Sequence, residues 1–95
     1  MGYLSVEFVK KNFALAMLVE DPLKTVERLM EFFTSRRIYV DSIHLQSVED
    51  GQAKILIYCL IEKDRAAHTR NALERLKGIL ELQVLEHKEH HTVHP

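Results

Sequence analysis

The chain has 95 residues, enough for one domain, and its formal net charge is −1 at pH 7. Hydrophobic residues make up 46% and charged residues 28%, a composition typical of globular proteins rather than disordered ones. Basic and acidic residues are interspersed, so the sequence lacks the basic excess of a nucleic-acid-binding protein. No apolar run reaches the ~20 residues that a membrane span needs, and the first residues lack a signal peptide's apolar segment. We therefore expect a cytoplasmic protein with no nucleic-acid or membrane partner.

The first predicted strand covers residues 12–20 (NFALAMLVE), which are apolar on both faces. A short buried helix is the alternative for this run. Asp21-Pro22 then indicates a helix start, because the Asp carboxylate can cap free N–H groups and proline suits the first helical position. The helix is expected to end near Arg36-Arg37, where cations suit its carbonyl end. Its predicted core stripe follows i, i+3, i+4, i+7 spacing: Val26, Leu29, Met30 and Phe33.

Two further strands are predicted at residues 38–48 and 53–61, joined by a hairpin turn at residues 49–52 (EDGQ). The first alternates Ile43 and Leu45 with polar residues, which indicates a half-buried strand. The second is apolar on both faces. One face carries Ile55, Ile57, Cys59 and Ile61, and the other carries Leu56, Tyr58 and Leu60.

A second helix is predicted from Asp64 to Lys77, followed by Gly78 as a residue free to take positive φ. Its shallow apolar stripe is Ala66, Ala67, Leu73 and Leu76. Residues 80–87 (LELQVLEH) alternate again and predict the last strand. The order strand, helix, strand, strand, helix, strand predicts an α+β fold of the ferredoxin-like βαββαβ type, a four-stranded antiparallel sheet with two helices on one face. We divide the chain into an N-terminal arm (1–11), a domain (12–87) and a polar C-terminal tail (88–95).

In this fold the helices cover one sheet face only, so Leu56, Tyr58 and Leu60 are expected on the uncovered face. An apolar patch of that kind on a small domain favours an interface. The alternative is that residues 1–11 fold back over the patch. Of the two we favour association.

No catalytic constellation is visible, so the sequence predicts a non-enzyme without a cofactor. Cys59 is expected to be a buried structural residue, and the three glycines are too scattered to form a phosphate-binding loop. His44 and His68 are interpreted as surface residues. The tail histidines can chelate transition metals, but we interpret this as adventitious and predict no specific metal site: His87, His90, His91 and His94. RNA binding is disfavoured, because residues 53–59 hold one aromatic and no flanking glycine.

Four segments carry a resemblance to a known family: residues 15–21 (LAMLVED), residues 25–29 (TVERL) with Phe33, residues 35–43 (SRRIYVDSI) and residues 72–82 (ALERLKGILEL). Through these segments, residues 12–87 resemble the ACT family of amino-acid-sensing regulatory domains, and most of all the short, single-domain regulatory subunit of acetolactate synthase. It implies a non-catalytic subunit that pairs edge to edge with itself. It also implies docking on a thiamine-diphosphate-dependent catalytic subunit in branched-chain amino-acid biosynthesis.

The resemblance further implies a branched-chain amino acid bound by the loop before the first helix. The candidate ligand-binding residues are Asp21, Pro22, Leu23, Lys24, Thr25, Tyr39 and Val40. Lys24 stands where the family has a glycine, and Tyr39 where it has an asparagine. These two departures count against valine sensing, but they do not count against activation of a catalytic subunit. Helix capping alone would also explain Asp21. The alternatives are a stand-alone homodimeric amino-acid sensor and a structural dimerisation module.

Overall fold

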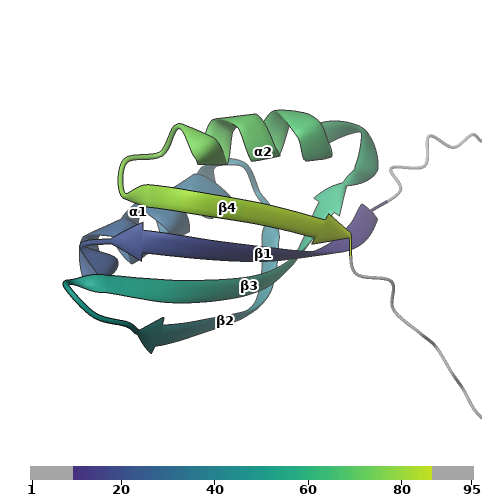
Figure 1. Ribbon diagram of the computed structural model, residues 1–95. Coiled ribbons are helices and arrows are strands. Elements are labelled where there is room, and N and C mark those ends of the chain that lie inside the picture. The colour runs from purple at the N-terminus through teal and green to yellow at the C-terminus, as the bar shows by residue number, and fades with distance from the viewer. Residues whose placement is uncertain (1–9, 87–95) are drawn as a thin grey trace, which may run out of the picture.

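The computed structural model describes residues 10–86, and its elements follow the predicted order (Figure 1). The first half contains β1 (Lys10–Glu20), α1 (Pro22–Ser35) and β2 (Tyr39–Ser47). The second half contains β3 (Gln52–Glu62), the short 3-10 helix η1 (Lys63–Arg65), α2 (Ala66–Glu74) and β4 (Ile79–Glu86). No helix in this part of the chain is long and apolar enough to cross a membrane.

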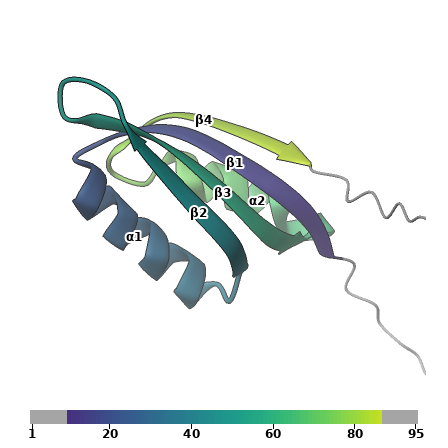
Figure 2. The same cartoon turned by 90° about the horizontal axis from the view of Figure 1, so that it is seen from below.

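The strands form one antiparallel sheet in the order β2-β3-β1-β4. Both helices lie on the same side of it, α1 toward the β2 edge and α2 toward the β4 edge (Figure 2). The predicted ferredoxin-like fold is confirmed, and residues 12–20 form a strand rather than the alternative helix. β1 and β3 occupy the centre of the sheet, which explains why their sequences are apolar on both faces.

The core lies between the sheet and the helices. Alternate residues of the two central strands enter it, as the period of two requires: Phe13, Leu15, Met17 and Val19 from β1, and Ala53, Ile55, Ile57, Cys59 and Ile61 from β3. The helices contribute Leu29, Phe32, Phe33 and Leu73. The predicted assignment of faces in β3 is therefore confirmed.

Two details of the predicted helix stripes are wrong. Met30 is 40% exposed, whereas Thr25 and Phe32 are buried, so the buried face of α1 is Thr25, Leu29, Phe32 and Phe33. The reason is a hydrogen bond from the Thr25 hydroxyl to the Glu20 carbonyl oxygen (2.6 Å), which turns Thr25 inward. In α2, Ala67 is exposed, and only Thr69 and Leu73 are fully buried.

The carboxylate cap predicted for α1 does not form, and α2 departs from its predicted bounds. Asp21 occupies the N-cap position of α1 and Pro22 follows at the first helical position, but the Asp21 side chain makes no capping hydrogen bond. Its backbone is left-handed (φ 49°), whereas a capping side chain requires an extended residue. Asp64 lies inside the 3-10 turn, and α2 ends at Glu74 instead of Lys77. Gly78 does have positive φ (101°), at the turn into β4.

Gly78 lies where two connections of the fold meet. Its carbonyl oxygen accepts a hydrogen bond from the Glu20 N–H (2.9 Å), and the Thr25 side chain packs against its Cα. A Cβ added to Gly78 would overlap Thr25 Oγ1. The approach of the α2–β4 turn to the start of α1 therefore depends on the absence of a side chain at this position.

We predict that Gly78→Ala destabilises the protein more than Gly51→Ala. Both glycines have positive φ, so each substitution costs about 1–2 kcal/mol of backbone strain. Gly51 has open space around it, while at Gly78 the collision with Thr25 adds about 1–3 kcal/mol. Urea unfolding of both variants measures the difference. Equal midpoints would show that the contact with Thr25 does not constrain the fold.

Candidate functional site

The β1–α1 turn is held by backbone contacts from two other connections. The Asp21 N–H donates to the carbonyl oxygen of Gly51 in the β2–β3 turn (3.2 Å), and the Glu20 N–H donates to that of Gly78. The Arg28 guanidinium also donates to the Lys77 carbonyl oxygen (3.3 Å). The three turns therefore form one end of the molecule, and the candidate ligand-binding loop is a fixed part of it.

The candidate loop residues differ in what they offer a ligand. Thr25 is completely buried and its hydroxyl is engaged by Glu20, so it supports the turn instead of facing solvent. Leu23 is 80% exposed, an unusual position for a large apolar side chain, and Lys24 is also exposed. Asp21 is exposed with its carboxylate not used for capping, so capping does not account for this residue. The turn thus presents a carboxylate, an ammonium and an apolar side chain together.

The other two candidate ligand residues, Tyr39 and Val40, lie at the opposite end of the sheet. Tyr39 pairs with Leu60, which pairs with Asn12 near the start of β1. The distance along β1 from Asn12 to Glu20 is about 26 Å at ~3.3 Å per residue. A single copy of the chain therefore does not bring the two halves of the candidate site together.

The β2 edge offers a way to join them. Asp41 is its one charged residue, whereas β4, the other edge, carries Glu81 and Glu86. Charges protect an edge strand against pairing, so β2 is the less protected edge. Ser47 is level with Val19, next to the β1–α1 turn. Antiparallel pairing of two β2 strands about their centre would place Tyr39 of one copy beside Ser47 of the other, and so near that copy's turn.

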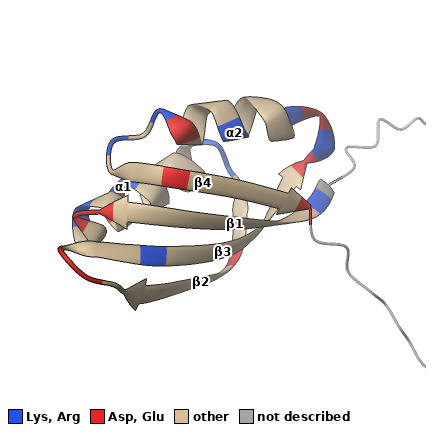
Figure 3. Cartoon of the chain, in the orientation of Figure 1, with Lys and Arg blue, Asp and Glu red and all other residues tan. Residues whose placement is uncertain are grey.

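Leu56, Tyr58 and Leu60 lie half-buried on the sheet face that the helices leave uncovered. Strand register places Ala14, Ala16 and Leu18 of β1 beside them, and their side chains are also half-buried. The His44 ring contacts the Tyr58 ring edge-on, with centroids 6.4 Å apart. Charged positions are sparse along the strands and gather in the turns and around α2 (Figure 3).

Near the centre of this face is a shallow concavity of about 560 Å³, with Ala16, Leu18 and Leu56 in its floor. Lys54 and Glu81 flank Leu18 on the neighbouring strands and also line the concavity. The face is thus an apolar surface with a few charges at its margin. Such a surface suits a protein partner better than a small polar ligand.

The chemical groups of the described residues do not assemble a reactive centre. Cys59 is 2% exposed, and burial raises the pKa of its thiol from 9.0 to about 12. Among residues 10–86, no three His, Cys, Asp or Glu side chains gather where they could hold a metal ion. His44 and His68 are exposed, as predicted. The tail histidines at positions 87, 90, 91 and 94 lie outside the described residues, as does most of the N-terminal arm.

One group of side chains was not predicted. Arg36, Arg65, His68 and Thr69 line a cavity between the end of α1 and the start of α2. The sequence presents Arg36 as a helix-terminal cation and His68 as a surface residue. Neither pattern predicts that the two residues line the same cavity. Only the sheet topology brings these distant segments together.

No protein-family model matches the sequence, and no curated protein sequence matches it. Solved structures match its fold. The C-terminal domain of the MgtC protein from Mycobacterium tuberculosis matches 96% of this chain and 100% of that domain, with a TM-score of 0.65 and 10% identity. The ACT domain from GTP pyrophosphokinase of Chlorobium tepidum matches 81% of this chain and 100% of its own length, with a TM-score of 0.67 and 13% identity.

The regulatory subunit of aspartate kinase from Thermus thermophilus, in a ligand-free form, matches 82% of this chain and 51% of its own, with a TM-score of 0.52 and 18% identity. Identities this low establish a shared fold. The chain therefore shares the fold of the ACT domain from GTP pyrophosphokinase.

We predict that Cys59 reacts with a thiol reagent only when the protein opens. At pH 8 the buried thiol is protonated, so native labelling should be far slower than labelling of the urea-unfolded chain. Because the unfolded thiol ionises near pH 9 and the folded one near pH 12, the free energy of unfolding should fall as pH rises across that interval. Cys59→Ala should lack this part of the pH dependence. Immediate stoichiometric labelling of the native protein would contradict the assignment.

Proposed function

We propose that this chain is a regulatory domain that pairs with a second copy through β2 and controls a larger catalytic subunit. The observation that carries the proposal is the division of the candidate ligand site between opposite ends of one chain. A site that only a pair completes binds its ligand in the paired state alone. Ligand binding then stabilises the pair by linkage, which is how a small non-catalytic domain can respond to a metabolite.

The turn suits an amino acid as that ligand. The N–H groups of Leu23 and Lys24 lie in the first turn of α1, where helical geometry provides no acceptor, and the Lys24 ammonium adds a positive charge. These groups can bind the carboxylate of an amino acid. The Asp21 carboxylate, which makes no capping hydrogen bond, can bind its ammonium group. Exposed Leu23 would contact a branched aliphatic side chain. A branched-chain amino acid fits this combination.

The uncovered sheet face supports docking of the larger subunit. Pairing through β2 uses an edge, so Leu56, Tyr58 and Leu60 remain accessible in the pair. Acetolactate synthase, a thiamine-diphosphate-dependent enzyme, is the catalytic partner that the sequence resemblance favours. A stand-alone amino-acid sensor is the second candidate function, and the exposed turn supports it equally well. A purely structural dimerisation module would use β2 without the turn.

We predict that the chain activates the acetolactate synthase catalytic subunit of its own organism. The assay compares rates with and without the chain, over a panel of valine, leucine and isoleucine. Activation that responds to the panel identifies a sensing subunit, and activation that ignores it identifies a subunit that activates without sensing these three amino acids. The acetolactate synthase assignment fails if the rate is unchanged and the two proteins do not co-elute. In that case, ligand-dependent thermal stabilisation, ~2.7 kcal/mol at 100 Kd, would favour the stand-alone sensor.

We further predict that Tyr58→Glu abolishes co-elution with the catalytic subunit and leaves the sedimentation mass of the chain alone unchanged. A charge placed among half-buried apolar side chains must be desolvated when a partner covers them. Asn71→Glu adds the same charge on the exposed surface of α2 and is the matched control. Circular dichroism checks that both variants keep their secondary structure. Unchanged co-elution of Tyr58→Glu would exclude this face as the docking surface.

A further inference from the structure

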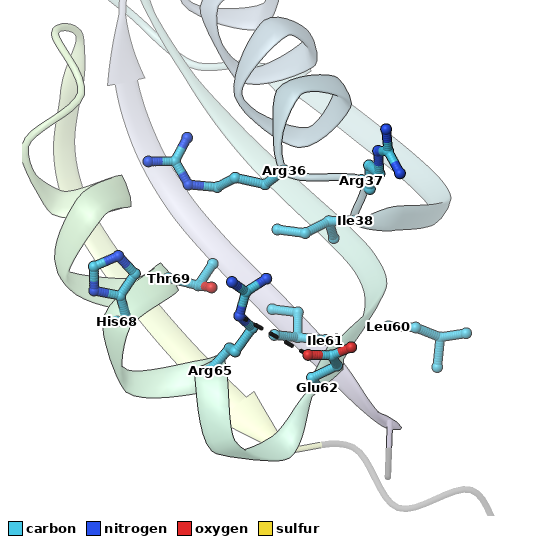
Figure 4. Close-up of a pocket in the computed structure, with 9 residues that line it drawn as sticks. All are labelled: Arg36, Arg37, Ile38, Leu60, Ile61, Glu62, Arg65, His68 and Thr69. Atoms are coloured by element: carbon cyan, nitrogen blue, oxygen red, sulfur yellow. Dashed lines mark ion pairs between the residues drawn. The ribbon is translucent and has the colours of Figure 1, made fainter. Parts of the chain in front are cut away.

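The cavity between α1 and α2 lies at the end of the molecule opposite the β1–α1 turn. It measures about 360 Å³, within the range of roughly 300–1,000 Å³ found for small-molecule sites. Figure 4 shows its walls, which come from the end of α1, the end of β3 and the start of α2. Ile38 and Ile61 give it an apolar side, and Ile61 is 4% exposed. The cavity lies away from the β1–α1 turn, and Leu60 belongs both to its lining and to the uncovered sheet face.

Its polar groups are mainly cationic. The Arg36 guanidinium lies 4.0 Å from the centroid of the Phe32 ring, a stacking contact that holds its position and leaves N–H donors available. Arg65 Nε lies 3.9 Å from Glu62 Oε1, which leaves the terminal nitrogens of Arg65 outside that ion pair. His68 of α2 also lines the cavity (Figure 4). Arg37 lies at the rim and points away.

Thr69 provides an independent observation. Its side chain is 5% exposed, and no hydrogen bond involves its hydroxyl anywhere in residues 10–86. Figure 4 shows the hydroxyl pointing into the cavity toward Arg65. A buried hydroxyl without a partner costs free energy, so nearly all such groups in native proteins are satisfied. A ligand oxygen in the cavity would supply the missing partner.

We propose that this cavity binds the phosphate group of a small organic phosphate. The donors come from the end of α1 (Arg36), from η1 (Arg65) and from α2 (His68 and Thr69), and all four line the cavity, so they can meet the oxygens of a tetrahedral anion from several directions. A planar carboxylate would use fewer of them. The first turn of α2 adds the positive end of the helix dipole. The apolar side formed by Ile38 and Ile61 accommodates the organic part of the ligand.

The test is calorimetric titration of the full chain at constant ionic strength with inorganic phosphate, glycerol 3-phosphate and succinate. We expect saturable binding of both phosphates and weaker binding of succinate. Arg36→Gln should weaken phosphate binding about tenfold or more. Arg70→Gln removes the same charge from the exposed side of α2, where Arg70 pairs with Glu74, and should change the affinity less than about twofold.

Thr69→Val separates binding from folding. The variant keeps the shape of a buried side chain and removes its unpaired hydroxyl, so its thermal midpoint should be equal to or above that of the wild type. Its phosphate affinity should nevertheless fall about two- to tenfold. The proposal is overturned if no probe binds saturably, if Arg70→Gln loses as much affinity as Arg36→Gln, or if Thr69→Val binds phosphate unchanged. Tighter binding of succinate than of the phosphates would overturn the choice of ligand.

Discussion

The contact between Thr25 and Gly78 is the constraint on which the β1–α1 end of this protein depends. The Thr25 hydroxyl donates to Glu20, the last residue of β1, and its side chain fills the space that a Cβ on Gly78 would take. This contact sets the rotation of α1, so that Phe32 and not Met30 enters the core. It also leaves Leu23 and Lys24 in solvent, because residues just before an inward-turned Thr25 must face outward. The side chains that the turn exposes therefore follow from this one packing contact.

The sequence predicted the order of elements because its signals are local. Because side chains alternate between the two faces of a strand, the sequence places Ile57 and Cys59 on one face of β3 and Tyr58 on the other. The structure has the same arrangement. Asp21-Pro22 correctly located the start of α1, yet capping by Asp21 was wrong. The left-handed backbone at Asp21 arises where its N–H bonds to Gly51, a residue from another turn, and no local pattern reports such a contact. Arg36 and Thr69 were missed as a pair for the same reason.

The proposals place a different task on each part of the sheet. Its β2 edge is suited to a second copy, its uncovered face to a larger protein, and its helix side carries the cationic cavity at one end and the β1–α1 turn at the other. A thin domain of this size buries little apolar surface, so pairing also adds stability that the isolated chain lacks. In this account, association and ligand binding are linked equilibria, and each raises the apparent affinity of the other.

The measurement that tests the central claim most directly is a search for intermolecular contacts between two copies of the chain. Mixed isotope labelling allows nuclear Overhauser effects between copies to be separated from those within one copy. Antiparallel β2 pairing predicts such effects between the Tyr39 ring of one copy and Ser47 of the other, strengthened by a branched-chain amino acid. If β2 shows no intermolecular effects at concentrations where the chain sediments as a dimer, pairing uses another surface and the completed ligand site does not exist.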